Sequence, residues 1–110
     1  MKTRELRLNK QLSKFIDNYT LEPGPTNLDG WLPDDLMDFW NFARHSKSLA
    51  AYMFPEQHKG RVIAVKLLAN YASNRATSIN CRMSGKVHTA LMYDHICQTI
   101  YNRLPDWAKW

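Results

Sequence analysis

The chain has 110 residues and a mass of 12.9 kDa, which is enough for one hydrophobic core and too little for a second domain with its own core. A hydrophobic content of 45% excludes intrinsic disorder, and no apolar run approaches the roughly 18 residues of a membrane span. The formal net charge of +5 is unevenly spread, because residues 15–43 carry six acidic and no basic side chains whereas residues 44–110 carry ten basic and three acidic ones. We expect a single domain over residues 1–110.

The N-terminal segment and the cysteines bear on the compartment. Residues 1–14 hold five basic side chains among scattered leucines and lack the continuous apolar stretch of a secretory signal. Cys81 and Cys97 are too few for a disulfide framework or a metal-site spacing, so we expect both thiols to be reduced and buried. These features predict a cytoplasmic protein.

The first half of the chain predicts two or three helices. Apolar residues at three- and four-residue spacings indicate a helix over residues 3–19, which ends before the prolines of a loop over residues 20–32. Pro33 fits the first turn of a second helix, and serine caps favour a short helix that starts at residues 46–48 and runs through residue 53. The acidic first turn and the bulky face of the second helix are formed by Asp34, Asp35, Leu36, Phe39, Trp40 and Ala43.

The second half predicts a long helical hairpin. Apolar residues recur at steps of three and four over residues 59–84, which indicates one helix of about seven turns. Gly85 is a natural C-cap, and the next helix starts at Lys86 and stops at Pro105. So short a connection forces an antiparallel pair, with an alanine-rich seam between the two helices. The two apolar stripes are Val65, Leu68, Ala72, Ala76, Ile79 and Met83, and Ala90, Tyr93, Cys97, Ile100 and Leu104. The predicted fold class is all-α, with four or five helices around this C-terminal hairpin.

The sequence offers little for catalysis. The four glycines, at 24, 30, 60 and 85, never cluster as a phosphate-binding loop requires. His88 and His95 are two turns, about 10 Å, apart on one helix, which is too far for a single metal ion. No spacing pairs a nucleophile with a base. We therefore predict a protein that is not an enzyme and uses neither a metal nor a cofactor.

A helix-turn-helix over residues 68–86 is the alternative to one long helix. Three positions fit that motif: Leu68, Ala69 and Ile79. However, Ser73 stands where the turn prefers glycine, and Asn74 and Arg82 would have to enter a small core without polar partners. We favour the continuous helix, and a DNA-binding regulator stays the alternative function.

The charge pattern predicts where a partner binds. No carboxylate occurs between Gln57 and Tyr93, so this segment attracts phosphates or acidic side chains unless the acidic stretch over residues 15–43 covers it. Arg75 and Arg82 are seven residues apart and point the same way, either towards a partner or into internal ion pairs. The candidate binding residues are Lys66, Tyr71, Arg75, Arg82, Lys86, Trp107 and Trp110.

Two tryptophans follow the helix stop at Pro105. We expect Trp107 to fold back as part of the core, against the hairpin or the second helix. The alternative is a tail that inserts into a pocket of another protein, as aromatic anchors do at binding hot spots.

The run from Asn74 to Trp110 resembles the C-terminal end of small uncharacterised helical proteins of phages, plasmids and other mobile elements. The residues that carry this resemblance are Ala76, Arg82, Gly85, Ala90, Leu91, Ile100, Tyr101, Leu104, Pro105, Trp107 and Trp110. It implies a helical hairpin, and it supplies no catalytic residues. It also implies a genetic context in which small proteins frequently bind a host or phage machine, including as inhibitors of bacterial defence.

These observations together predict a non-enzymatic accessory or inhibitory protein of a mobile element. We expect it to dock on a protein or nucleoprotein assembly through its basic helical surface, with nucleic acid as a further partner and no membrane partner. A self-assembling structural component of a phage particle is a third hypothesis. The sequence does not fix the oligomeric state.

Overall fold

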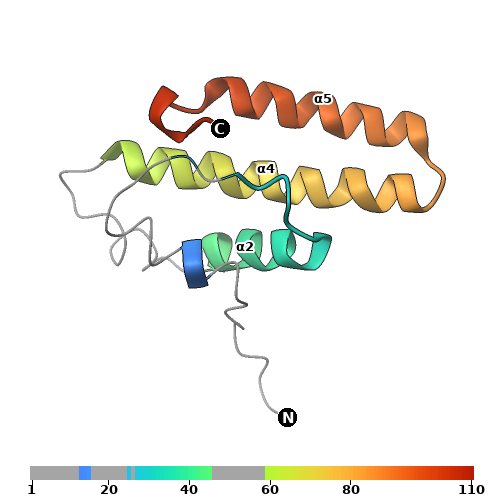
Figure 1. Ribbon diagram of the computed structural model, residues 1–110, viewed down its shortest axis with the longest axis horizontal. Coiled ribbons are helices and arrows are strands. Elements are labelled where there is room, and N and C mark those ends of the chain that lie inside the picture. The colour runs from blue at the N-terminus through green and yellow to red at the C-terminus, as the bar shows by residue number, and fades with distance from the viewer. Residues whose placement is uncertain (1–12, 16–24, 26, 46–58) are drawn as a thin grey trace, which may run out of the picture.

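The structure is a computed structural model that describes residues 13–15, 25, 27–45 and 59–110 (Figure 1). Its elements are α2 (Pro33–His45), α4 (Lys59–Met83), α5 (Val87–Arg103) and the short 3-10 helix η2 (Asp106–Ala108). The described residues form no strand, α4 lies between α2 and α5, and α4 and α5 make an antiparallel hairpin. The fold is all-α, as predicted.

Two predicted helices fall largely or wholly outside the described residues. Residues 13–15 are helical, and the rest of the helix predicted over residues 3–19 is not described. The short helix predicted through residue 53 lies outside the described residues altogether. None of the helices that are described is long and apolar enough to cross a membrane.

Helix α2 starts where the sequence predicts. Pro33 is its first residue, and the Asp35 carboxylate accepts a hydrogen bond from the backbone N–H of Leu32 at 3.4 Å. A side chain that reaches back in this way satisfies an N–H that the first helical turn leaves unpaired. Leu36 and Phe39 on the inner face are completely buried, so this start places the bulky side chains against the core.

Helix α4 runs without a break and is buried on two sides. On one side Ser78 is fully buried and donates a hydrogen bond to Asp94 of α5. Ala72 and Ala76 are also buried, but at about 100° per residue they lie about 120° and 160° around the helix from Ser78. Both alanines belong to the hydrophobic core that also contains Phe39 of α2 and Cys97 of α5, and α4 packs against both of these helices.

The last position of the predicted α4 stripe is wrong. Met83 is 77% exposed, whereas Val65 and Leu68 in the first half of the helix are buried. Helix α2 has 13 residues and α4 has 25, which correspond to about 20 and 37 Å. The end of the hairpin projects beyond α2, so among the helices that the structure describes none covers the apolar side chains there (Figure 1).

The connection between α4 and α5 is a Schellman motif centred on Gly85. The backbone N–H of Gly85 donates to the carbonyl of Arg82 at 3.1 Å, and that of Lys86 donates to the carbonyl of Cys81 at 2.7 Å. Gly85 has a φ of +80°, which an L side chain rarely adopts. The predicted C-cap is confirmed, and it explains why the chain reverses within three residues.

The segment after α5 folds back onto the molecule, although not as predicted. Ala108 is buried, and the ring of Trp110 packs at 5.0 Å from the ring of Tyr101, measured between centroids. Trp107 is 39% exposed, so the expectation that it is the core residue of the tail was wrong. Ala108 of η2 lies in the core, and Trp110 packs against it, so these two residues and not Trp107 anchor the tail.

Candidate binding surface

The structure brings four of the seven predicted binding residues together and places the other three apart from them. Tyr71, Arg75, Arg82 and Trp110 take part in contacts along one edge of the hairpin, with Asp29 and Asp94. Lys66 is exposed on the outward side of α4, and Lys86 is exposed at the end of the hairpin. Trp107 lies on η2, so the seven residues do not form one continuous site.

The two arginines share the carboxylate of Asp94. Arg82 donates a hydrogen bond to Oδ2, Ser78 donates to Oδ1, and Nη1 of Arg75 lies 3.5 Å from the same Oδ1. Burial alone would raise the pKa of Asp94, but the hydrogen bonds from Ser78 and Arg82 and the charges of both arginines outweigh it and lower the pKa. One carboxylate neutralises one guanidinium, so the cluster keeps a net positive charge.

A second set of contacts joins three distant segments. The hydroxyl of Tyr71 donates to one carboxylate oxygen of Asp29 at 3.2 Å, and the indole N–H of Trp110 donates to the other at 3.2 Å. The hydroxyl of Tyr101 donates to the Trp110 carbonyl. Burial and the neighbouring Asp29 charge raise the pKa of Tyr71 far above its usual value, so the phenol remains a donor. The polar groups of Tyr71 and Trp110 thus make their hydrogen bonds within the fold.

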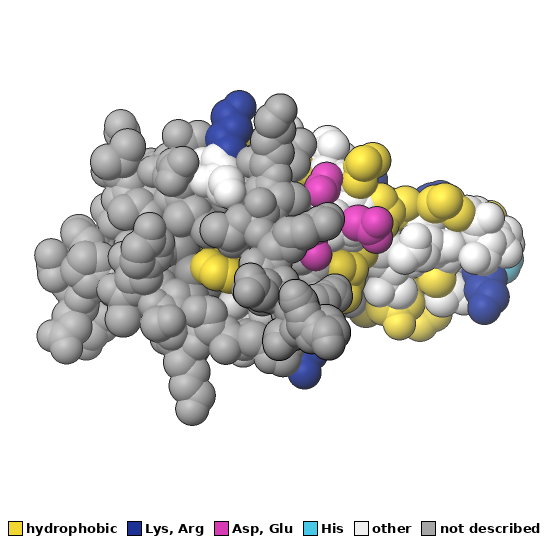
Figure 2. All heavy atoms as spheres, turned by 90° about the horizontal axis from the view of Figure 1, so that it is seen from below, with side chains coloured by type: hydrophobic (Ala, Val, Ile, Leu, Met, Phe, Trp, Pro, Cys, Tyr) yellow, Lys and Arg dark blue, Asp and Glu magenta, His cyan; other side chains and the backbone are white. Residues whose placement is uncertain are grey.

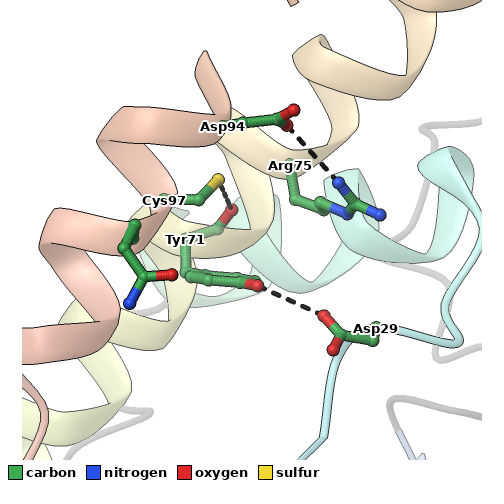
Figure 3. Close-up of a pocket in the computed structure, with 6 residues that line it drawn as sticks. Asp29, Tyr71, Arg75, Asp94 and Cys97 are labelled. Carbon is green, nitrogen blue, oxygen red and sulfur yellow. Dashed lines mark hydrogen bonds and ion pairs between the residues drawn. The ribbon is translucent and has the colours of Figure 1, made fainter. Parts of the chain in front are cut away.

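A shallow cleft of about 390 Å³ lies between these two sets of contacts (Figure 3). Its lining residues are Asp29, Tyr71, Arg75, Asp94, Cys97 and Gln98. Burial raises the pKa of Cys97 to about 11, and its thiol donates to the Tyr71 carbonyl at 3.8 Å, so it is not activated as a nucleophile. Nε of Arg75 is buried without a hydrogen-bond partner. We find no activated nucleophile or free carboxylate base among these lining residues.

The described residues bring together no group of three or more histidine, cysteine or acidic side chains that fits a metal ion. His88 and His95 are both exposed on α5. Cys97 is buried as predicted, whereas Cys81 is only partly buried, and both are free thiols.

The projecting end of the hairpin presents basic and apolar side chains together. We call Arg82, Met83 and Lys86 the tip surface; all three are exposed, and Met83 is the most exposed large hydrophobic residue described. Figure 2 views the molecule from the side on which α2 lies and shows apolar and basic side chains beside each other on this end. No residue from Lys59 to Tyr93 is acidic, but the carboxylate of Asp94 accepts a hydrogen bond from Arg82 at the edge of this surface.

Two residues of the arginine cluster escaped the sequence analysis. Neither Ser78 nor Asp94 is among the binding residues predicted from the sequence. A signal for Asp94 was present, since a reversal at Gly85 places it as far along α5 as Arg75 is along α4. Asp29 carried no such signal, because a loop residue can be placed only by the tertiary fold.

Comparisons with known proteins do not add to this description: no family model matches the chain, and no curated protein or solved structure is similar to it.

Proposed function

We propose that this chain is a non-enzymatic docking protein that binds a protein assembly through the tip surface of its hairpin. Its origin in a mobile element, an inhibitory action on its target and a cytoplasmic location belong to the same proposal, and they rest on the sequence resemblance and on the N-terminal segment. The target surface is apolar at its centre and acidic at its rim.

The observation that carries the proposal is the uncovered end of the hairpin. Met83 would be buried if α2 extended over it, and instead it stands exposed between two cations, Arg82 and Lys86. Exposed apolar side chains that lie among polar ones are typical of protein interfaces, where methionine and arginine are enriched. The Schellman turn holds these three residues on a rigid support, which limits the entropy lost on binding.

A protein partner fits this surface better than a nucleic acid. Binding to the DNA backbone depends on several basic side chains that neutralise phosphates, for example about 6–10 contacts in one protein. At the end of the hairpin only Arg75, Arg82 and Lys86 are basic, and Asp94 already engages both arginines. Helix α4 is also unbroken from Lys59 to Met83, so the turn near Ser73 that a helix-turn-helix needs is not present.

Affinity capture from a host lysate with matched charge variants tests the proposal. Lys86→Glu reverses a charge on the tip surface, and Lys66→Glu makes the same change on the outward side of α4. We expect a captured protein that resists nuclease treatment and whose recovery falls at least about tenfold with Lys86→Glu and is unchanged with Lys66→Glu. Met83→Ser should lower the same recovery without a change in charge.

Three results would overturn the proposal. These are the recovery of no protein, equal recovery with both charge variants, and a complex that disappears after nuclease treatment. The last result would indicate a nucleic-acid partner, and the complex should then weaken steeply with salt.

A further inference from the structure

The outer face of α5, turned away from α4, is unusually apolar for an exposed surface. Its side chains are Val87, His88, Leu91, Met92, His95 and Ile96. The four apolar ones are between 39% and 64% exposed, and both histidines are exposed. These positions follow the spacing of one helical face, and none of them is an acid, a lysine or an arginine. An exposed apolar face of this kind marks an interaction site.

The face has the same chemistry when it is read in either direction. Counted outward from the midpoint between Leu91 and Met92, each side presents an apolar residue, then a histidine, then an apolar residue. At about 100° per residue, His88 and His95 lie near the midline of the face and the apolar side chains flank them. A rotation by 180° about an axis through the midpoint places Val87 on Ile96, His88 on His95 and Leu91 on Met92.

We propose that this face binds a second copy of the chain, with the two α5 helices antiparallel and the two-fold axis between Leu91 and Met92. In an isologous dimer each residue meets its counterpart from the same patch, so a patch must be complementary to itself. Here apolar side chains meet apolar side chains and an imidazole meets an imidazole.

Charge supports a second copy over a different partner. An acidic partner would be attracted to Arg82 and Lys86, which lie at the hairpin end and not on this face. In the antiparallel register, Lys86 lies opposite the segment around Cys97 of the other copy. From His95 to Tyr101 that segment contains no lysine or arginine. Two copies therefore meet without opposing lysines or arginines.

The face is small for a dimer interface. Stable interfaces bury about 1,600 Å², or about 800 Å² on each partner, and six side chains on under three turns provide less than that. We expect a reversible dimer with a Kd in the range of about 10–100 μM. The six side chains of the face do not include Met83 of the tip surface, so Met83→Ser should leave the dimer intact.

Sedimentation velocity from about 5 to about 500 μM tests the dimer. The wild-type chain should pass from monomer to dimer, and Leu91→Glu should weaken the association at least about tenfold, since it places two carboxylates beside the two-fold axis. Leu32→Glu is the matched control: Leu32 is 67% exposed and precedes α2, on the opposite side of α4 from α5. A wild-type chain that stays monomeric, or equal effects of the two variants, would overturn the proposal.

Disulfide cross-linking tests the register separately. In a Cys81→Ser background, a mixture of His88→Cys and His95→Cys chains should form a linked heterodimer well above either chain alone. Position 88 of one copy faces position 95 of the other, whereas two copies of position 88 are separated by seven residues, about 10 Å, which exceeds disulfide range. Preferential linking of His88→Cys chains to themselves would exclude the antiparallel register.

Discussion

The indole ring of Trp110 meets the phenol ring of Tyr71 edge to face, with 5.2 Å between the ring centroids and an interplanar angle of 86°. Both side chains donate a hydrogen bond to Asp29, Tyr71 from the middle of α4 and Trp110 from the segment that follows η2. The contact therefore closes the tail over α4 and fixes the loop that precedes α2. The carboxylate of Asp29 therefore links the stability of the folded chain to the position of the loop before α2.

Trp110→Ala should lower the free energy of unfolding by about 2 kcal/mol, because it removes two aromatic contacts and the hydrogen bond to Asp29. Urea denaturation followed by far-UV circular dichroism measures the change without relying on tryptophan fluorescence. Trp107→Ala removes the same side chain from a more exposed position and should cost less than about 1 kcal/mol. An equal loss in both variants would contradict the placement of the tail.

Asp94→Asn should destabilise the hairpin by about 1–2 kcal/mol at pH 7, since it leaves Arg75 and Arg82 close together without a carboxylate. The pKa of Asp94 is lowered in the folded state, so its contribution is complete above the ordinary aspartate pKa and is lost as the pH falls through the folded one. The difference in unfolding free energy between the two proteins should be constant from about pH 7 to 5 and shrink below about pH 4.

Serial urea titrations of the wild-type chain and of Asp94→Asn over this pH range measure that difference. Ser78→Ala is a useful companion, because it removes one donor to Asp94 and leaves both ion pairs in place. Ser78→Ala should lower the free energy of unfolding by less than Asp94→Asn does, with the same dependence on pH. If the difference grew as the solution became more acidic, the ion pairs would not be the source of the stability.

Local patterns in the sequence predicted the elements, and contacts between distant segments decided the surfaces. Pro33 and Gly85 marked the start of α2 and the turn of the hairpin because each constrains its own backbone. The predicted stripe of α4 is buried or partly buried at every position except Met83, but periodicity cannot tell where a neighbouring helix ends. For this reason the burial of Met83 was mispredicted, since it depends on where α2 ends.

The candidate binding site was predicted less well than the fold. Arg75 and Arg82 do point the same way, and the alternative of internal ion pairs is the one that the structure contains. Tyr71 could not be assigned from sequence, because its hydroxyl binds a loop residue 42 positions away. Lys86, another candidate binding residue, is exposed, since a residue next to a tight reversal has few neighbours.

Gly85→Ala should lower the free energy of unfolding by about 1 kcal/mol. No atom lies within 4 Å of an added Cβ at this position, so the cost comes from the φ of +80° and not from a collision. Gly85→Asn should cost less, because asparagine tolerates this backbone conformation better than alanine. Gly30→Ala is the control: it also has open space around it, it does not have a left-handed φ, and it should be neutral or slightly stabilising. Chemical denaturation of the three variants would contradict this account if Gly30→Ala lost more stability than Gly85→Ala.

The two cysteines should differ sharply in their reactivity. Burial raises the pKa of Cys97 to about 11, so at pH 8 roughly one thiol in a thousand is ionised, and the thiolate is the species that alkylating reagents attack. Cys81 is partly exposed at the end of α4. Iodoacetamide at pH 8, followed by peptide mass spectrometry, should modify Cys81 at least about tenfold faster than Cys97.

Labelling in strong denaturant is the control. There both thiols should react at similar rates, which would show that the difference in the native protein comes from the fold and not from the local sequence around each cysteine. Equal rates in the native protein would mean that α5 separates from α4 on the timescale of labelling, and the contact between the Cys97 thiol and the Tyr71 carbonyl would then not be persistent.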